Sequence, residues 1–282
     1  MSGLAISTVL FDGYEMAVAF EEIGAAGLNL VEPAFIEGYT DFTEASFAES
    51  AAKALVSRAA AAGLAMGAVS AHMDLGQPGE AAEAMLARRI RFAAACQCPV
   101  LITNAGQVHD ADAIVHRLEA ALPLCEELGV MLALENPGHG SGAAIHDAAS
   151  GVAFLARLDH PLLRLNYDAG NVYSYSGGRL QPGDDLAMAD TARIGHLHLK
   201  DLSASDEDWA FCAIGEGLVD FRAVLRRLPS DLPMSLELPL RLARPKRGDP
   251  VRRAEPLPLP MLRIALRESL TNLAAMRGVH SD

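Results

Sequence analysis

Four side chains of the kind that bind metal ions come at the ends of four successive apolar segments. Glu135 closes "LALE", Asp168 closes "LNYD", His198 lies in "HLHL", and Glu237 lies in "SLEL". Three carboxylates brought together would repel one another and be driven towards protonation, and a divalent cation removes that penalty. Mixed oxygen and nitrogen ligands suit manganese, magnesium, cobalt or zinc. The four residues therefore predict one divalent metal site, provided that the four segments lie side by side.

The third of these segments, "IGHLHLKDLS", alternates polar and apolar residues. On a strand, neighbouring side chains point to opposite faces, so His196, His198 and Lys200 share one face, and Leu197 and Leu199 share the other. This pattern indicates one face packed against helices and one face lining a polar space. His198 is then the predicted ligand. For His196, deeper in the strand, a hydrogen-bonded core histidine is favoured over a second ligand.

The rest of the chain alternates strand-like and helix-like segments. Runs such as "EAAEAMLARRIRFAAACQ" are rich in good helix formers. Three helix-like runs end at Gly27, Gly63 and Gly129, each followed directly by an apolar strand start, and glycine just past a helix end is a stop signal. The predicted strands are 4–10, 28–34, 65–73, 99–105, 130–137, 162–168, 193–201 and 234–240.

Eight strands that alternate with eight helices imply parallel pairing through right-handed crossovers. An open doubly wound sheet with a nucleotide site carries a glycine-rich turn after its first strand, and "FDGYEM" lacks that turn. We therefore predict a closed (β/α)8 TIM barrel, forming a single domain over residues 1–282. The last helix is expected over 259–277, and the Pro- and Arg-rich stretch 242–260 reads as a long loop before it. In such a barrel the C-terminal strand ends form one rim, where Glu135, Asp168, His198 and Glu237 would meet.

The composition narrows the class of protein. A net charge of −13 argues against a protein that binds a phosphate backbone, so no nucleic-acid partner is expected. The four cysteines show no metal-type spacing, and neither a secretory signal nor an apolar run long enough for a membrane span is evident. A cytoplasmic location with no membrane partner is the expectation. The sequence is compatible with a homo-oligomer but does not require one.

The ordered set "LALEN", "YDAGN", "HLHLKD", "IGEGLVDF" and "SLELP" resembles the sugar-phosphate isomerase/epimerase-like family of xylose-isomerase-type TIM barrels. The resemblance covers essentially the whole chain. It implies that Glu135, Asp168, His198 and Glu237 bind the metal, with manganese favoured, and that Glu135 and Glu237 also form the catalytic acid/base pair. It places Lys200 and Asp201 in the motif after the histidine, and His72 and Glu32 at polar strand ends around the pocket. The residues expected to contact substrate are His72, Asn104, His139, Lys200 and Glu216.

The activity that this resemblance implies is a metal-dependent isomerase or epimerase acting on a keto-sugar or related polyhydroxy ketone. One glutamate would take a proton beside the carbonyl, the cation would stabilise the enediolate, and the other glutamate would return a proton. A dehydratase of the inosose type is the alternative, because the same enediolate can expel a hydroxyl group.

Two features separate this chain from ketose 3-epimerases of the family. Asn171 replaces their usual histidine, and no arginine follows His198 closely. A nuclease of the endonuclease IV branch is less favoured, because that branch needs further zinc ligands. A non-catalytic sugar-binding barrel would have little use for two facing glutamates. In the simplest alternative, the three carboxylates only cap neighbouring helices.

Overall fold

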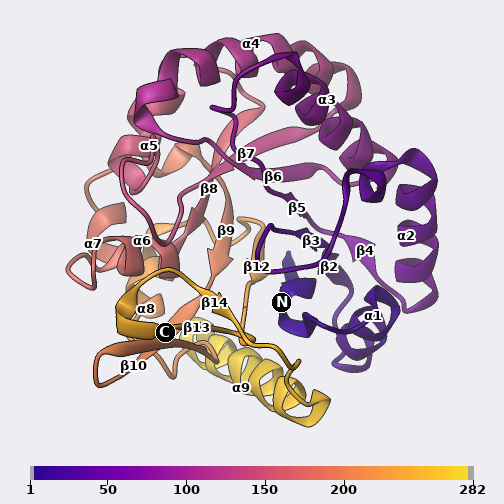
Figure 1. Ribbon diagram of the computed structural model, residues 1–282. Helices are drawn as coiled ribbons and strands as arrows, with labels where there is room; N and C mark the ends of the chain where they lie inside the picture. The colour runs from indigo at the N-terminus through magenta and orange to yellow at the C-terminus, as the bar shows by residue number, and fades with distance from the viewer. Residues whose placement is uncertain (1–2, 279–282) are drawn as a thin grey trace.

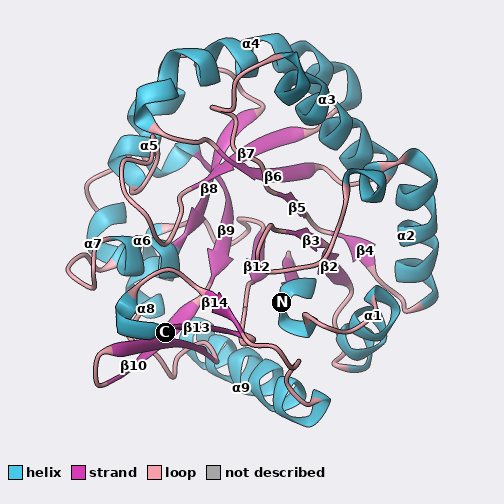
Figure 2. Ribbon diagram, in the orientation of Figure 1, coloured by secondary structure: helices cyan, strands magenta, loops and turns pink. Residues whose placement is uncertain are grey.

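The computed structural model describes residues 3–278, and its centre is a parallel sheet curled into a barrel (Figures 1 and 2). Neighbouring strands follow the order β3-β5-β6-β7-β8-β9-β12-β1-β2-β4, and every pairing between them is parallel. The strands are β1 (Leu4–Ser7), β2 (Leu30–Glu32), β3 (Ala34–Phe35), β4 (Ala65–Met66), β5 (Val69–Ala71), β6 (Val100–Asn104), β7 (Met131–Glu135), β8 (Leu163–Asp168), β9 (Ile194–Leu199) and β12 (Met234–Leu236).

The barrel closes because the two ends of this order belong to the same two stretches of chain. β2 pairs with β4, and β3, which follows β2 after Pro33, pairs with β5, which follows β4. A proline has no N–H to donate to the ladder, so the strand is interrupted there. Between β4 and β5, Gly67 lies so close to β1 that an added Cβ would come within 2.9 Å of the Ala5 side chain. Counting each interrupted pair as one strand gives the eight positions of a (β/α)8 barrel, as the sequence predicts.

The helices cover the outside of the barrel (Figure 1). In the described chain, seven of the eight strand positions are each followed by one α-helix, and β8 is followed by two short α-helices. They are α1 (Met16–Ala25), α2 (Glu49–Ala61), α3 (Glu80–Ala95), α4 (Ala111–Leu128), α5 (Ala148–Leu155), α6 (Ala169–Tyr175), α7 (Pro182–Leu186), α8 (Phe221–Arg227) and α9 (Leu259–Gly278). The three predicted stop glycines all have positive φ, 80° at Gly27, 75° at Gly63 and 66° at Gly129.

A second sheet was not predicted. Strands β10 (Asp201–Ser205), β11 (Asp208–Cys212), β13 (Leu242–Arg244) and β14 (Val251–Arg252) pair antiparallel in that order. The prediction of a simple loop over 242–260 is therefore wrong for β13 and β14. Arg252 ion-pairs with Asp12 and Asp41, which fastens this sheet to the loops after β1 and β3. Residues 8–11 form a 3-10 helix, so the predicted first strand, 4–10, is wrong for residues 8–10.

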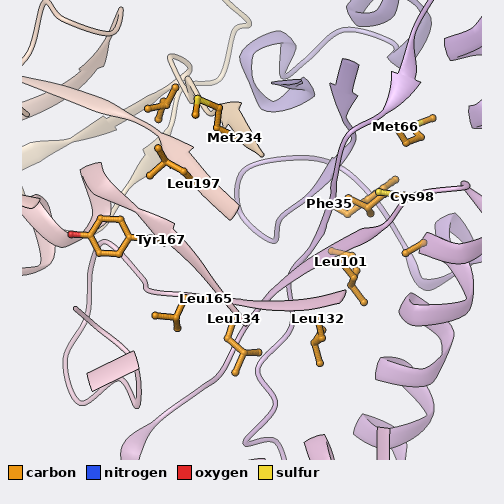
Figure 3. Close-up of a cluster of buried hydrophobic side chains, with 14 of the residues drawn as sticks. Phe35, Met66, Cys98, Leu101, Leu132, Leu134, Leu165, Tyr167, Leu197 and Met234 are labelled. Atoms are coloured by element: carbon orange, nitrogen blue, oxygen red, sulfur yellow. The ribbon is translucent and has the colours of Figure 1, made fainter. Parts of the chain in front are cut away.

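The alternation of side chains separates two apolar layers. Leu134, Leu165, Leu197 and other outward side chains pack between the barrel and its helices (Figure 3). A smaller cluster of Ala68, Val100, Ile102 and Ala133 fills the inside. Above this inner cluster the inward positions become polar, so the C-terminal rim is lined by charged groups. No helix among residues 3–278 is both long and apolar enough to span a membrane.

Candidate metal centre

The four predicted ligands come from four adjacent strands. Glu135 and Asp168 are the last residues of β7 and β8, His198 lies near the end of β9, and Glu237 directly follows β12. Parallel pairing sets Asp168 opposite His198, and His198 opposite Ser235, two residues before Glu237. One potential ligand atom from each residue lies within 4.8 Å of the other three, and all four side chains are at most 2% exposed. The structure therefore brings the four together in one buried cluster.

His198 faces this cluster with one ring nitrogen. Its Nδ1 lies 3.1 Å from Glu135 Oε2, 3.3 Å from Glu237 Oε2 and 3.8 Å from Asp168 Oδ2. Its Nε2 points the other way and lies 3.0 Å from Glu32 Oε2. Glu32 was expected at the pocket, but it lies beneath the histidine, fully buried, and does not line the cavity.

Three of the atoms that face one another in the cluster lack hydrogen-bond partners among the described residues. In the part of the chain that the structure describes, Asp168 Oδ2, His198 Nδ1 and Glu237 Oε2 are buried polar atoms without a hydrogen bond. Buried polar atoms are nearly always satisfied, so unpaired ones require a reason. Two carboxylates and an imidazole aimed at one point fit a divalent cation, with Glu135 as a fourth ligand.

Lys200 lies at the edge of the cluster. Its Nζ is 2.8 Å from Asp168 Oδ2 and 2.5 Å from Glu237 Oε2, at ion-pair distance but without hydrogen-bond geometry, and it donates to Asn171 Oδ1 at 3.1 Å. Burial disfavours its charged form, but the charges of Asp168 and Glu237 outweigh burial and hold the pKa of Lys200 well above its usual range. Lys200 is therefore a fixed positive charge beside the cluster.

The carboxylates experience opposite effects. Burial, together with the negative charges of Glu237 and Glu135, raises the pKa of Asp168 to about 8. Burial also acts against ionisation of Glu237, but the charges of Lys200 and His198 outweigh it and hold the pKa of Glu237 well below its usual range. The raised pKa of Asp168 reflects the repulsion expected between clustered acids. A cation among the carboxylates would favour the ionised form of each.

Two asparagines that sequence reasoning did not assign to the site hold Glu135 in place. Asn166 Nδ2 donates to Glu135 Oε2 at 2.6 Å, and Asn171 Nδ2 donates to Glu135 Oε1 at 3.1 Å. Asn171 stands at the position noted as a departure from ketose 3-epimerases, and here it bridges Glu135 and Lys200. Asp168 Oδ1 accepts from the backbone N–H of Asn171, so Asp168 caps α6 and turns its other oxygen to the cluster.

A cavity of about 190 Å³ opens onto the cluster. Glu135, Glu237 and Lys200 line its inner end, and His72, Asn104 and His139 line its walls. These predicted substrate contacts therefore lie where substrate would enter. His72 Nε2 is buried without a hydrogen-bond partner among residues 3–278 and lies 3.6 Å from Glu135 Oε2.

Glu216 does not reach this cavity. It is exposed on the turn between Gly215 and Gly217, whose N–H groups donate to Asp201 Oδ2, and the turn packs against α9. Asp201 therefore stabilises this turn by accepting hydrogen bonds from it, and it also lies outside the cavity. The expectation that Glu216 contacts substrate is not supported. The resemblance matched Glu216 to a sequence motif but gave no information on where its side chain points.

Tyr39, on the loop after β3, is a cavity residue that the sequence did not indicate. Burial raises the pKa of its hydroxyl group to about 12, so the group stays protonated and can donate. No motif surrounds Tyr39. The only signal was the polar loop "EGYTD" at a C-terminal strand end, where barrel enzymes place their pockets.

The structure is thus a closed (β/α)8 barrel whose C-terminal rim carries four buried side chains that could hold one metal ion. The chain belongs to the Xylose isomerase-like TIM barrel family, whose sequence pattern matches residues 20–254. A search of curated protein sequences gives no match.

Several solved structures share this fold at low identity. D-psicose 3-epimerase with D-tagatose from Clostridium cellulolyticum H10 aligns at TM-score 0.73 and 15% identity, over 98% of this chain and 99% of that one. The IolI protein with a bound zinc atom aligns at 0.71 and 14%, over 97% of both chains. The probable 3-DHS dehydratase AsbF of Bacillus anthracis aligns at 0.65 and 16%, over 83% of this chain and 92% of that one.

Proposed function

We propose that this protein is a divalent-metal-dependent isomerase or epimerase acting on a keto-sugar or a related polyhydroxy ketone. The observation that carries the proposal is the buried cluster of Glu135, Asp168, His198 and Glu237, in which Asp168 Oδ2, His198 Nδ1 and Glu237 Oε2 face one another without a hydrogen bond among the described residues. Two proteins that share the fold also support the proposal. The D-psicose 3-epimerase supports the reaction class, and the IolI protein with its bound zinc atom supports a metal-dependent site.

The four residues would hold one divalent cation, with manganese favoured. When bound, this cation supplies the positive charge that stabilises an oxyanion developing beside a carbonyl group. Lys200 supplies a second, permanent positive charge at the inner end of the cavity.

Glu135 and Glu237 would move the protons. They come from the outermost strands of the arc β7-β8-β9-β12, so they approach the cavity from opposite ends of the cluster. One takes the proton from the carbon next to the carbonyl, leaving an enediolate, and the other returns a proton to the opposite face or to the neighbouring carbon. Glu237 stays ionised beside Lys200 and His198, so it is ready to accept a proton.

The cavity walls suit a ligand with many hydroxyl groups. His72, Asn104, His139 and Tyr39 offer neutral donors and acceptors, which can bind hydroxyl groups in either direction. No arginine lines the described part of this cavity, so a bidentate clamp on a phosphate group is missing from its walls. A free polyhydroxy ketone is the substrate class that we favour.

A dehydratase of the inosose type is the second candidate. It would use the same proton removal, and the fold is shared with the probable dehydratase AsbF. The two reactions differ only after the enediolate forms, when a dehydratase loses a hydroxyl group as water.

Incubation in heavy water with manganese tests the proposal. Ketohexoses, ketopentoses and keto-inositols would each be incubated with wild-type protein and followed by NMR. We expect deuterium at the carbon beside the carbonyl of at least one of them, with an epimer or isomer as product. An unsaturated ketone would assign the dehydratase instead. A protein that loads manganese and exchanges no proton in the whole panel would contradict both.

A further inference from the structure

The two histidines of β9 make different hydrogen bonds, and the difference concerns which nitrogen of each ring carries the proton. His198 Nε2 lies 3.0 Å from Glu32 Oε2, and Ser70 Oγ donates to the other oxygen, Glu32 Oε1, at 2.9 Å. Glu32, Ser70 and His198 are each 0% exposed. Bulk solvent does not contact these groups.

The partner of His198 decides its tautomer. An ionised carboxylate only accepts hydrogen bonds, so the ring nitrogen next to Glu32 must be the one that carries the hydrogen. In the neutral ring, which is the form that binds a metal ion, the lone pair then lies on Nδ1, the nitrogen that faces Glu135, Asp168 and Glu237.

His196 has the opposite arrangement. Asn166 Nδ2 donates to Glu135 Oε2, so the other end of that amide, Oδ1, is an acceptor, and it lies 2.8 Å from His196 Nδ1. His196 Nδ1 therefore carries the hydrogen, and its Nε2 accepts from Ser235 Oγ at 3.2 Å. Both nitrogens are occupied, so the neighbouring group of Glu32, His196 and His198, though close enough for a metal ion, has no lone pair left on His196.

We infer that Glu32 is a positioning residue that fixes His198 as the Nε2–H tautomer and so aims Nδ1 at the cation. A series of hydrogen bonds through Ser235, His196 and Asn166 orients Glu135 in a similar way, because it holds the Asn166 amide that donates to the Glu135 carboxylate. Outer hydrogen bonds of this kind orient a ligand and increase its basicity. The inference rests on the metal-binding part of the proposed function and extends it to residues outside the ligand set.

Nitrogen-15 NMR of histidine-labelled, zinc-loaded protein tests the tautomers in the wild-type chain, with variants used only to assign the signals. We expect His198 to show a protonated Nε2 and a zinc-bound Nδ1, and His196 to show a protonated Nδ1 and no zinc contact. Replacement of each histidine in turn by glutamine assigns the signals. Zinc on Nε2 of His198, or on either nitrogen of His196, would overturn the inference.

Calorimetric titration with Mn²⁺ tests the role of Glu32. Glu32→Gln keeps an acceptor but loses the charge, and Glu32→Leu loses both. We expect weaker binding in that order, within the roughly 10–100-fold range typical of outer hydrogen-bond partners. Asp185→Asn is the matched control, because it also removes a buried carboxylate, one bonded to Tyr167 and Ala148, and it should leave Mn²⁺ affinity unchanged.

An affinity for Mn²⁺ within twofold of wild type in Glu32→Leu would overturn the positioning role. If that variant does not fold, the tautomers of the wild-type protein still decide the question. A protein that binds the ion through His198 Nδ1 but turns over no ketone would contradict the proposed function and leave this inference standing.

Discussion

The two halves of the barrel contribute differently to the site. The arc β7-β8-β9-β12 places one ligand-type residue at each C-terminal strand end, and its strands run without interruption. In the opposite half, β2/β3 and β4/β5 are each broken in two, and the inward residues include Glu32 and Ser70, which lie beneath His198. The cavity walls also come largely from this half, through Tyr39, His72 and Asn104.

This difference indicates a division of labour. The unbroken strands of the arc bring the four ligand-type side chains together, and the register between β8 and β9 shifts once, between Leu165 and Asn166. The interrupted half does not have to bring several side chains to one point. Glu32 bonds to one ligand-type residue, His198, and the wall residues of this half each face the cavity separately. Substitutions in the arc should therefore affect metal binding and proton transfer. Substitutions on the cavity wall of the other half should affect substrate binding, and those at Glu32 should affect metal binding through the orientation of His198.

Removal of the metal should have the largest effect. Dialysis against a strong chelator is expected to abolish turnover and to lower the melting temperature, because an ion at 100 times its Kd stabilises the folded state by about 2.7 kcal/mol. Hydrogen exchange should increase at the ends of β7, β8, β9 and β12 more than at those of β4 and β5. Manganese added back is the control and should restore both. Turnover and melting temperature that are both indifferent to the chelator would contradict a metal enzyme.

Replacing one acid/base residue in the arc should come next. Glu237→Gln keeps an oxygen ligand but removes the base, so turnover at saturating manganese should fall by roughly 10²–10⁴-fold. Glu22→Gln, on the surface and paired with Arg263, is the control and should keep wild-type turnover. Near-normal turnover by Glu237→Gln would remove this residue from the proton-transfer step.

A substitution on the wall of the other half should cost less. His72→Leu removes a nitrogen that lies in the cavity without a partner in residues 3–278, and one hydrogen bond is worth about 0.5–1.5 kcal/mol. We expect kcat/KM to fall roughly two- to tenfold by that measure, with Mn²⁺ affinity unchanged. A calorimetric titration that finds Mn²⁺ binding lost in His72→Leu would break the division between the two halves.

The smallest effect is expected outside both halves of the site. Glu216 is exposed on a turn away from the cavity, so Glu216→Gln should leave kcat/KM unchanged and change stability by no more than about 0.5 kcal/mol. Steady-state kinetics and thermal melting check this. A clear rise in KM would show that the turn moves to the substrate in solution.

The barrel and the clustering of the four candidate ligands could be predicted because both depend on local patterns. A glycine stop before each of three apolar strand starts marks the repeat, and the period of two in "HLHLK" shows which residues face inward. Parallel strands end at one rim, so Glu135, Asp168, His198 and Glu237 could be placed together before any coordinates were known.

The supporting residues could not be predicted in the same way. Asn166 reads as part of an apolar strand, and its role depends on which atom of its neighbour it faces. Tyr39 lies on a loop whose path follows from tertiary packing. In the sheet of β10, β11, β13 and β14, the pairing of β11 with β13 joins distant segments, with Trp209 opposite Arg244 and Ala210 opposite Ala243. Its last two strands lie in a stretch rich in proline and arginine, where strand propensity is low.

A crystal structure of the manganese-loaded protein, with anomalous diffraction data, tests the central claim most directly. The account predicts one anomalous peak bounded by Glu135, Asp168, His198 Nδ1 and Glu237, at metal–ligand distances of roughly 2.0–2.5 Å. No peak at this position, or a peak between Glu32, His196 and His198, would contradict it.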